Sequence, residues 1–513
     1  MSPIVLLSFV IGYFLLLLAV AWYTSKNSDN DSFFNGNKNS NWMLVAFGMI
    51  GTSLSGVTFV SVPGGVGKDF FAYFQLVIGY FLGYLVVAFV LLPLYYKMNL
   101  TSIYTYLEKR IGVSAHKAGA FFFILSRTVG ATARLYLVIN ILQIFILDKL
   151  QIPFTNTVGV PFVVTTLVIL VLILLYTFEG GVKTIIYTDT LQTTGMLVGL
   201  VACIYFISKA MNTDFSGVFE VMKQKNYTQV FNFNPLEKSF FIKQILGGMF
   251  ITITMTGLDQ EMMQKNISVK TLGSSQKNMM TLSVVLLLVN FLFLFLGGVL
   301  HVYAAANNIT ATGDDLFPTI ALGDTFSASI GVVFIIALIS ALFPSVDGAI
   351  TSLTSCFCID ILGFNKSTYT EAEKKKKRLA VHLSFAVVFF LLVLIFKAIN
   401  DKSIIQFILK FAGITYGPLL GLFAFGILTK KVINPKYVWP ICIAGPLLTL
   451  IIDLICNPKY YGDLLHTTLG LDNISAFIFN GYKIGPELIL INGTITFLGL
   501  LIVSKKYTEN KFG

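Results

Sequence analysis

The chain has 513 residues, of which 56% are hydrophobic and 12% are charged, and its formal net charge is +11. A soluble globular protein carries about 25% charged residues, so this composition, with a mean hydropathy of +0.80, excludes that class and predicts an all-α membrane protein. The basic residues lie between apolar segments, so the positive charge does not indicate a nucleic-acid partner.

The apolar segments predict thirteen membrane spans, because a helix needs about 20 apolar residues to cross a bilayer. They lie near residues 3–23, 42–66, 74–97, 118–147, 157–178, 184–208, 239–263, 279–304, 328–362, 379–398, 403–428, 437–456 and 484–504. The first has no basic start and is long enough to span, so we expect a retained helix rather than a signal peptide. The whole chain, 1–513, is expected to form one transmembrane domain.

The orientation follows from the loops that are rich in Lys and Arg, which stay on the cytoplasmic side of a membrane. These are residues 97–117, 265–277, 366–378, 430–436 and 505–511. We therefore expect an inner-membrane protein with its N-terminus outside and its C-terminus in the cytoplasm.

The second span is unusual, because Gly48 to Thr58 is a run rich in Gly, Ser and Thr. One interpretation is a broken helix whose freed carbonyls could bind a desolvated cation at the membrane midplane. The alternative is a tightly packed helix with small residues at its interface. Similar irregular stretches recur in the spans 239–263 and 403–428.

Several spans contain ionisable residues, which are costly in a membrane and indicate function. Arg127 and Arg134 are seven residues apart and share one helical face. Asp189, Asp347 and Lys410 lie in other spans. Either they line a polar pathway, or the arginines form structural ion pairs with the two aspartates.

For the other polar residues and the cysteines, the sequence indicates only general roles. Asp259 and Glu261 sit at the cytoplasmic end of a span, where we expect an interfacial role, and His301 and His382 are expected to be structural. The histidines do not have metal-ligand spacing. The cysteines are expected to be free packing thiols; they are Cys203, Cys356, Cys358, Cys442 and Cys456.

Pro344 lies inside the span 328–362, so it should free the carbonyl near residue 340 and kink the helix. Ala341 and Ser345 flank the expected kink, and Asp347 follows it. A freed carbonyl, a hydroxyl and a carboxylate are oxygen ligands suited to a monovalent cation.

Four motifs extend these inferences: GTSLSGVTFVSVP, EGGVKTIIYTDTLQ, DQEMMQK and ITYGPLLGLFAFGIL. With them the chain resembles the sodium:solute symporter family over about residues 20–430, and the bacterial sialic acid symporters in particular. The resemblance implies a LeuT-like core of two inverted five-helix repeats at 42–428. One peripheral helix, 3–23, would precede this core, and two, within 437–504, would follow it.

The resemblance also implies a main sodium site. Its ligands would be the carbonyls of Gly51 and Leu54 on the first core helix, with the Ala341 carbonyl and the Ser345 hydroxyl on the eighth. Pro344 stands where the family usually has another hydroxyl residue.

A second sodium site occurs in some family members, and its acid matches Asp189. Its serine positions match Asp347 and Gly348, so a carboxylate stands where a neutral oxygen is expected. This carboxylate either strengthens a cation site or carries a proton.

Solute contacts are implied less directly. An arginine that binds the substrate carboxylate in the sialic acid symporters matches Gly130. Arg127 and Arg134 lie one turn before and after it, so a basic group could still reach the cavity, and Arg134 is the expected anchor. The other expected contacts are Ser53, Ser55, Thr58, Tyr80, Phe250 and Lys410.

These observations predict a sodium-coupled symporter, not an enzyme, that imports a small polar or anionic organic solute by alternating access. Sodium would be the coupling ion, and the partners would be the solute and membrane lipid, with no oligomer required. The alternatives are a proton-coupled symporter of the same fold and a transporter-like membrane sensor. A polytopic membrane enzyme is disfavoured because the sequence has no His, Cys or Asp/Glu metal cluster.

Overall fold

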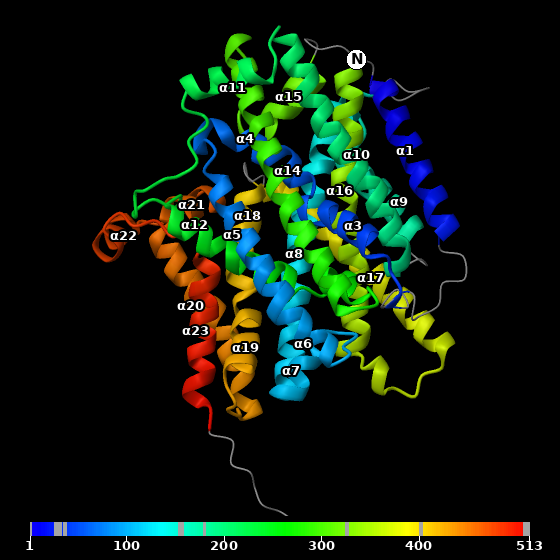
Figure 1. The fold of residues 1–513 in the computed structure, drawn as a ribbon, viewed down its shortest axis with the longest axis vertical. Coiled ribbons are helices and arrows are strands. Elements are labelled where there is room, and N and C mark those ends of the chain that lie inside the picture. Colours follow the sequence, from blue (N-terminus) through cyan, green and yellow to red (C-terminus); the bar gives the residue numbers. More distant parts are fainter. Residues whose placement is uncertain are drawn as a thin grey trace, which may run out of the picture.

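The structure is a computed structural model that describes residues 3–24, 33, 38–151, 158–177, 181–323, 328–399 and 404–505. Within these residues it is almost wholly helical, and the only β-type pairings are isolated bridges. Figure 1 shows the helices packed side by side in an elongated bundle. The predicted all-α class is confirmed.

The α-helices are α1 (Pro3–Thr24), α3 (Trp42–Leu54), α4 (Gly56–Asp69), α5 (Tyr73–Val86), α6 (Leu92–Lys97), α7 (Thr105–Arg110), α8 (Val113–Phe145), α9 (Phe162–Thr177), α10 (Gly181–Ala210), α11 (Phe215–Gln224), α12 (Phe241–Thr252), α13 (Gln260–Ile267), α14 (Leu272–Ala306), α15 (Leu316–Leu322), α16 (Ala328–Cys356), α17 (Glu371–Ile399), α18 (Ile404–Thr415), α19 (Gly417–Leu428), α20 (Val438–Cys456), α21 (Pro458–Leu465), α22 (Asp472–Phe479) and α23 (Leu488–Val503). Three π-helical turns continue α5, α12 and α16: η2 (Val87–Leu91), η4 (Ile253–Gly257) and η6 (Phe357–Ile361). The short 3₁₀ turns are η3 (Leu147–Lys149), η5 (Gly313–Asp315), η7 (Phe364–Lys366) and η8 (Pro435–Tyr437).

Eight helices in the described ranges are long and apolar enough to cross a membrane, or up to eleven spans exist if each bent helix pair counts as one. The bent pairs are α3 with α4, α12–η4 with α13, and α18 with α19, with bends of 53°, 63° and 44°. The helices α9 and α23 are apolar but shorter. Every one of the thirteen predicted segments overlaps one of these helices or bent pairs.

The second predicted span is a broken helix. α3 ends at Leu54, α4 begins at Gly56, and Ser55 between them has φ 25° and ψ 165°. A positive φ is costly for a residue with a side chain and interrupts the helical hydrogen-bond ladder. The broken-helix interpretation is therefore confirmed for this segment.

The centre of the bundle is formed by α16, which packs against α10, α8, α3 and α4. Figure 1 shows α10 and α16 running alongside each other. α16 continues as a helix through Pro344. The break in α3–α4 therefore lies against a continuous helix, and these two elements place the residues of the candidate site.

Candidate functional site

A cavity of about 120 Å³ lies beside the break between α3 and α4, where α5, α8, α12–η4, α13, α14 and α18 also contribute. Five of the solute contacts expected from the sequence line it: Ser53, Ser55, Thr58, Tyr80 and Arg134. Further polar lining comes from Thr52, Tyr73, Tyr84, Arg127, Thr252, Thr256 and Asn290. Hydroxyl and amide groups on a mostly apolar wall can orient a small polar molecule.

The remaining two expected contacts, Phe250 and Lys410, are not among the lining residues. Phe250 is half-buried and packs against the hydrophobic core. Lys410 Nζ lies 2.5 Å from Asp453 Oδ2 on α20. Its helix α18 instead faces the cavity with apolar side chains, including Ile408, so the helical rotation turns Lys410 toward α20.

The two arginines of α8 have different surroundings. Arg127 is buried and forms an ion pair with Glu261 of α13. Arg134 is half-buried on the cavity wall, and it makes no ion pair with any residue that the structure describes. The described ion pairs also do not join either arginine to Asp189 or Asp347, the partners considered from the sequence.

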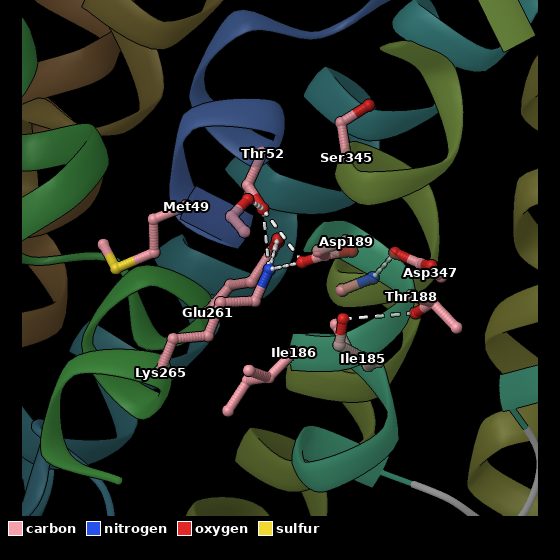
Figure 2. Close-up of polar contacts among 12 residues, drawn as sticks. Met49, Thr52, Ile185, Ile186, Thr188, Asp189, Glu261, Lys265, Ser345 and Asp347 are labelled. Atoms are coloured by element: carbon pink, nitrogen blue, oxygen red, sulfur yellow. Dashed lines mark hydrogen bonds and ion pairs between the residues drawn. The ribbon is translucent and has the colours of Figure 1, made fainter. Parts of the chain in front are cut away.

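Asp189 instead pairs with a lysine from a distant part of the chain. Lys265 Nζ, on α13, lies 2.7 Å from Asp189 Oδ2 on α10 and 2.7 Å from Thr52 Oγ1 on α3. The same nitrogen is 3.6 Å from Glu261 Oε1, one turn earlier on α13. Figure 2 shows these side chains converging from three helices. We call Thr52, Asp189, Glu261 and Lys265 the ion cluster.

The expected interfacial role of Asp259 and Glu261 is wrong. Both side chains are buried, because α13, which is bent by 63° from α12–η4, packs against α16, α14 and α3. Asp259 caps α13 by accepting hydrogen bonds from the backbone N–H groups of Glu261 and Met262. Its other oxygen accepts a 2.9 Å hydrogen bond from the Tyr416 hydroxyl.

The helices that carry the expected ligands of the main sodium site, α3 and α16, touch where α3 ends. A Cβ on Gly51 would lie 3.3 Å from Pro344 Cγ, so the two helices touch beside Ala341 and Ser345. The Gly51 carbonyl accepts a 3.2 Å hydrogen bond from the Ser55 N–H at the break and keeps a second lone pair. Ser345 Oγ donates to the Leu342 carbonyl at 2.7 Å and keeps its acceptor lone pairs. The residues expected as sodium ligands therefore lie on two helices that touch, and their oxygens are carbonyls and one hydroxyl.

Three residues of the site were missed from the sequence. Lys265 ends the DQEMMQK motif, and the sequence predicts it at the start of a cytoplasmic loop. Thr193 Oγ1 is buried against Gly51 and has no hydrogen-bond partner among the described residues. Asn290 lines the cavity, and its buried Oδ1 likewise lacks a partner in the described part of the chain. A lone amide in the apolar run VVLLLVNFLFLF was the available signal for Asn290.

The histidines and cysteines have structural surroundings. The Nε2 atom of His301 accepts a 2.9 Å hydrogen bond from the Gly67 backbone N–H. His382 contacts the hydroxyls of Thr354 and Thr177 at 3.1 and 3.3 Å. The five cysteines are free and buried, as expected.

Comparison with known proteins gives the same picture. The sodium:solute symporter family matches residues 33–439. The sodium/sialic acid symporter SiaT of Proteus mirabilis (strain HI4320) is 25% identical over 500 residues, which cover 94% of this chain and 93% of that protein. The sodium/sialic acid symporter NanT of Aliivibrio fischeri (strain ATCC 700601 / ES114) is 26% identical over 443 residues, 82% of each.

A solved structure of a Na⁺-coupled sialic acid symporter, in a substrate-bound outward-open state, superposes with a TM-score of 0.78. The two chains are 20% identical, and the match covers 98% of this chain and 99% of the other. The likeness confirms the predicted LeuT-like fold. Because the family matches most of the chain, the protein belongs to the sodium:solute symporter family, whose members couple solute transport to sodium.

Proposed function

We propose that the protein imports a small anionic organic solute, such as a sugar acid, together with sodium, and that Arg134 binds the solute's carboxylate in the cavity. The observation that carries this proposal is the position of Arg134 on the cavity wall without an ion pair among the described residues. A charged group in a membrane interior is costly without a partner. Its planar guanidinium can hold a carboxylate with two hydrogen bonds.

The other polar side chains of the cavity can form hydrogen bonds with the hydroxyl groups of a sugar acid. Asn290 offers a carbonyl oxygen without a protein partner in the described residues, and Thr58 and Tyr80 offer hydroxyls. Both relatives are named as sodium/sialic acid symporters, and a sialic acid has one carboxylate and several hydroxyls. A sugar acid therefore matches the charge and hydrogen-bonding groups of the wall.

Sodium would be held by the carbonyls of Gly51, Leu54 and Ala341 and by the Ser345 hydroxyl. These ligands come from both sides of the contact between the broken α3–α4 helix and α16. Because ion and solute sites share the broken helix, binding of one would favour binding of the other and shift the equilibrium between outward-open and inward-open states.

The protein would lie in the inner membrane with its N-terminus outside. In support, the basic segments predicted to be cytoplasmic lie together. Arg110 donates hydrogen bonds to the carbonyls of Gly426 and Lys431, Lys366 pairs with Glu108, and Lys505 forms a bridge with Val432. Gathering of basic loops at one end of a helix bundle is typical of a cytoplasmic face.

The proposal is tested by uptake of radiolabelled N-acetylneuraminate and other sugar acids into proteoliposomes containing the purified protein. We expect uptake driven by an inward sodium gradient and lost when choline replaces sodium at fixed pH. Uptake driven equally well by a proton gradient without sodium would instead support the proton-coupled alternative. Absence of counterflow of every labelled acid would reject an anionic sugar as the solute.

A further inference from the structure

The ion cluster has a feature that sodium coupling alone does not require: a lysine bound to the acid expected at the second sodium site. Lys265 is 3% exposed, and its ammonium contacts oxygens of Asp189, Thr52 and Glu261 at 2.7, 2.7 and 3.6 Å. An ammonium has three N–H donors. Three oxygens from α3, α10 and α13 therefore surround it in the way that oxygens surround a bound cation.

Space at the expected second site is also taken by protein groups. A Cβ on Gly348 of α16 would lie 2.3 Å from Glu261 Oε1 and 3.3 Å from Lys265 Nζ. A serine at position 348, as the family resemblance implies for a second sodium site, would collide with the Glu261 carboxylate. The residues present here do not fit a second sodium ion.

Charge leads to the same result. Asp347, also on α16, lies within electrostatic range of both Asp189 and Lys265. A sodium ion bound to Asp189 would lie next to the ammonium that already contacts this carboxylate. Two unit charges about 4 Å apart repel by about 4 kcal/mol at an effective dielectric constant of about 20. This repulsion opposes the attraction that the Asp347 carboxylate would offer to a sodium ion.

We infer that Lys265 is a built-in cation that takes the place of a second transported sodium ion, so that the protein couples one sodium ion to each solute. The lysine charge is part of the chain and stays with the protein, whereas a transported ion would have to be released. The remaining sodium ion binds at the contact between Gly51 and Pro344. The inference rests on the proposed sodium-coupled function and sets its stoichiometry.

The test counts bound sodium. Equilibrium binding of ²²Na⁺ to the purified full-length protein, without solute, is measured for the wild type and for Lys265→Met. We expect one sodium ion per wild-type protein and two per Lys265→Met protein, because the variant frees Asp189 and Asp347 for a second ion. Lys243→Met is the matched control, since Lys243 is also a buried lysine but bonds to the backbone carbonyls of Glu237 and Lys483. The control should bind one.

The outcomes are distinct. Two sodium ions on the wild type, or a single ion on both proteins, would overturn the inference. No specific sodium binding by the wild type would contradict sodium coupling itself. If Lys265→Met does not fold, the double variant Lys265→Met with Asp189→Asn removes both charges and is expected to bind one ion. Two ions on this double variant would also refute the role of Lys265.

Discussion

The hydroxyl oxygen of Thr193 occupies the space that a side chain on Gly51 would need. A Cβ on Gly51 would lie 2.3 Å from Thr193 Oγ1 and 3.3 Å from Pro344 Cγ. The end of the broken helix α3 is thus in direct contact with α10 on one side and α16 on the other. This contact sets how closely the carbonyls of α3 approach the oxygens of α16.

Gly51→Ala should abolish sodium-dependent uptake, because the added methyl group must separate α3 from α10 and α16. Overpacking of this kind costs about 1–3 kcal/mol of stability. Combining it with Thr193→Ala should recover part of the uptake by removing the clashing hydroxyl. Gly65→Ala is the control, because a Cβ at Gly65 meets no atom within 4 Å. Proteoliposome uptake of the four proteins is the measurement, and full activity of Gly51→Ala would show that the contact is not needed.

Ser345→Ala should raise the sodium concentration that gives half-maximal uptake. Loss of a hydrogen-bonding oxygen to a charged group costs about 1.5–3 kcal/mol, which is about a ten- to hundredfold increase in that concentration. Ser340→Ala on the same helix is the control, because the Ser340 hydroxyl donates to Tyr13. An equal effect of the two substitutions would assign the change to helix packing rather than to sodium.

Arg134→Gln should weaken binding of an anionic solute by about ten- to hundredfold, because one charge-assisted hydrogen bond is lost. Arg134→Lys should recover only part of the affinity, since an ammonium cannot offer two parallel N–H groups to a carboxylate. Solute affinity is measured by thermal shift or calorimetry on monodisperse protein. Wild-type affinity for N-acetylneuraminate in Arg134→Gln, if the wild type binds it, would remove Arg134 as the anchor.

Arg127 should behave differently from Arg134, because its partner Glu261 is buried with it. Arg127→Met leaves the Glu261 charge with only the more distant Lys265, and breaking a buried ion pair costs about 3–5 kcal/mol. The double variant Arg127→Met with Glu261→Gln should be more stable than Arg127→Met alone. The fraction of monodisperse protein after heating measures this. If Arg127→Met is as stable as the wild type, the ion pair does not hold α8 to α13.

The sequence by itself determined the class of this protein and the position of its apolar segments, and it offered a helix break between Gly48 and Thr58 as one of two interpretations. These features can be read locally, because apolar length is set by bilayer thickness and because Gly, Ser and Thr weaken a helix where they stand. The four motifs indicated the sodium:solute symporter family. The first motif also held the polar residues of the broken helix, and Arg134 was identified as an ionisable residue one turn beyond Gly130; the structure places these residues on the cavity wall.

Only the tertiary structure decided which charges meet. Asp189 and Lys265 are 76 residues apart, and Arg127 and Glu261 are 134 apart. Spacing within one helix fixes which residues share a face, but it does not fix the rotation of that helix or its neighbours. Lys410 therefore turned out to pair with Asp453 rather than to line the cavity. The bend before α13 carried Glu261 and Lys265 from an expected membrane interface into the core, where low polarity requires each charge to have a partner.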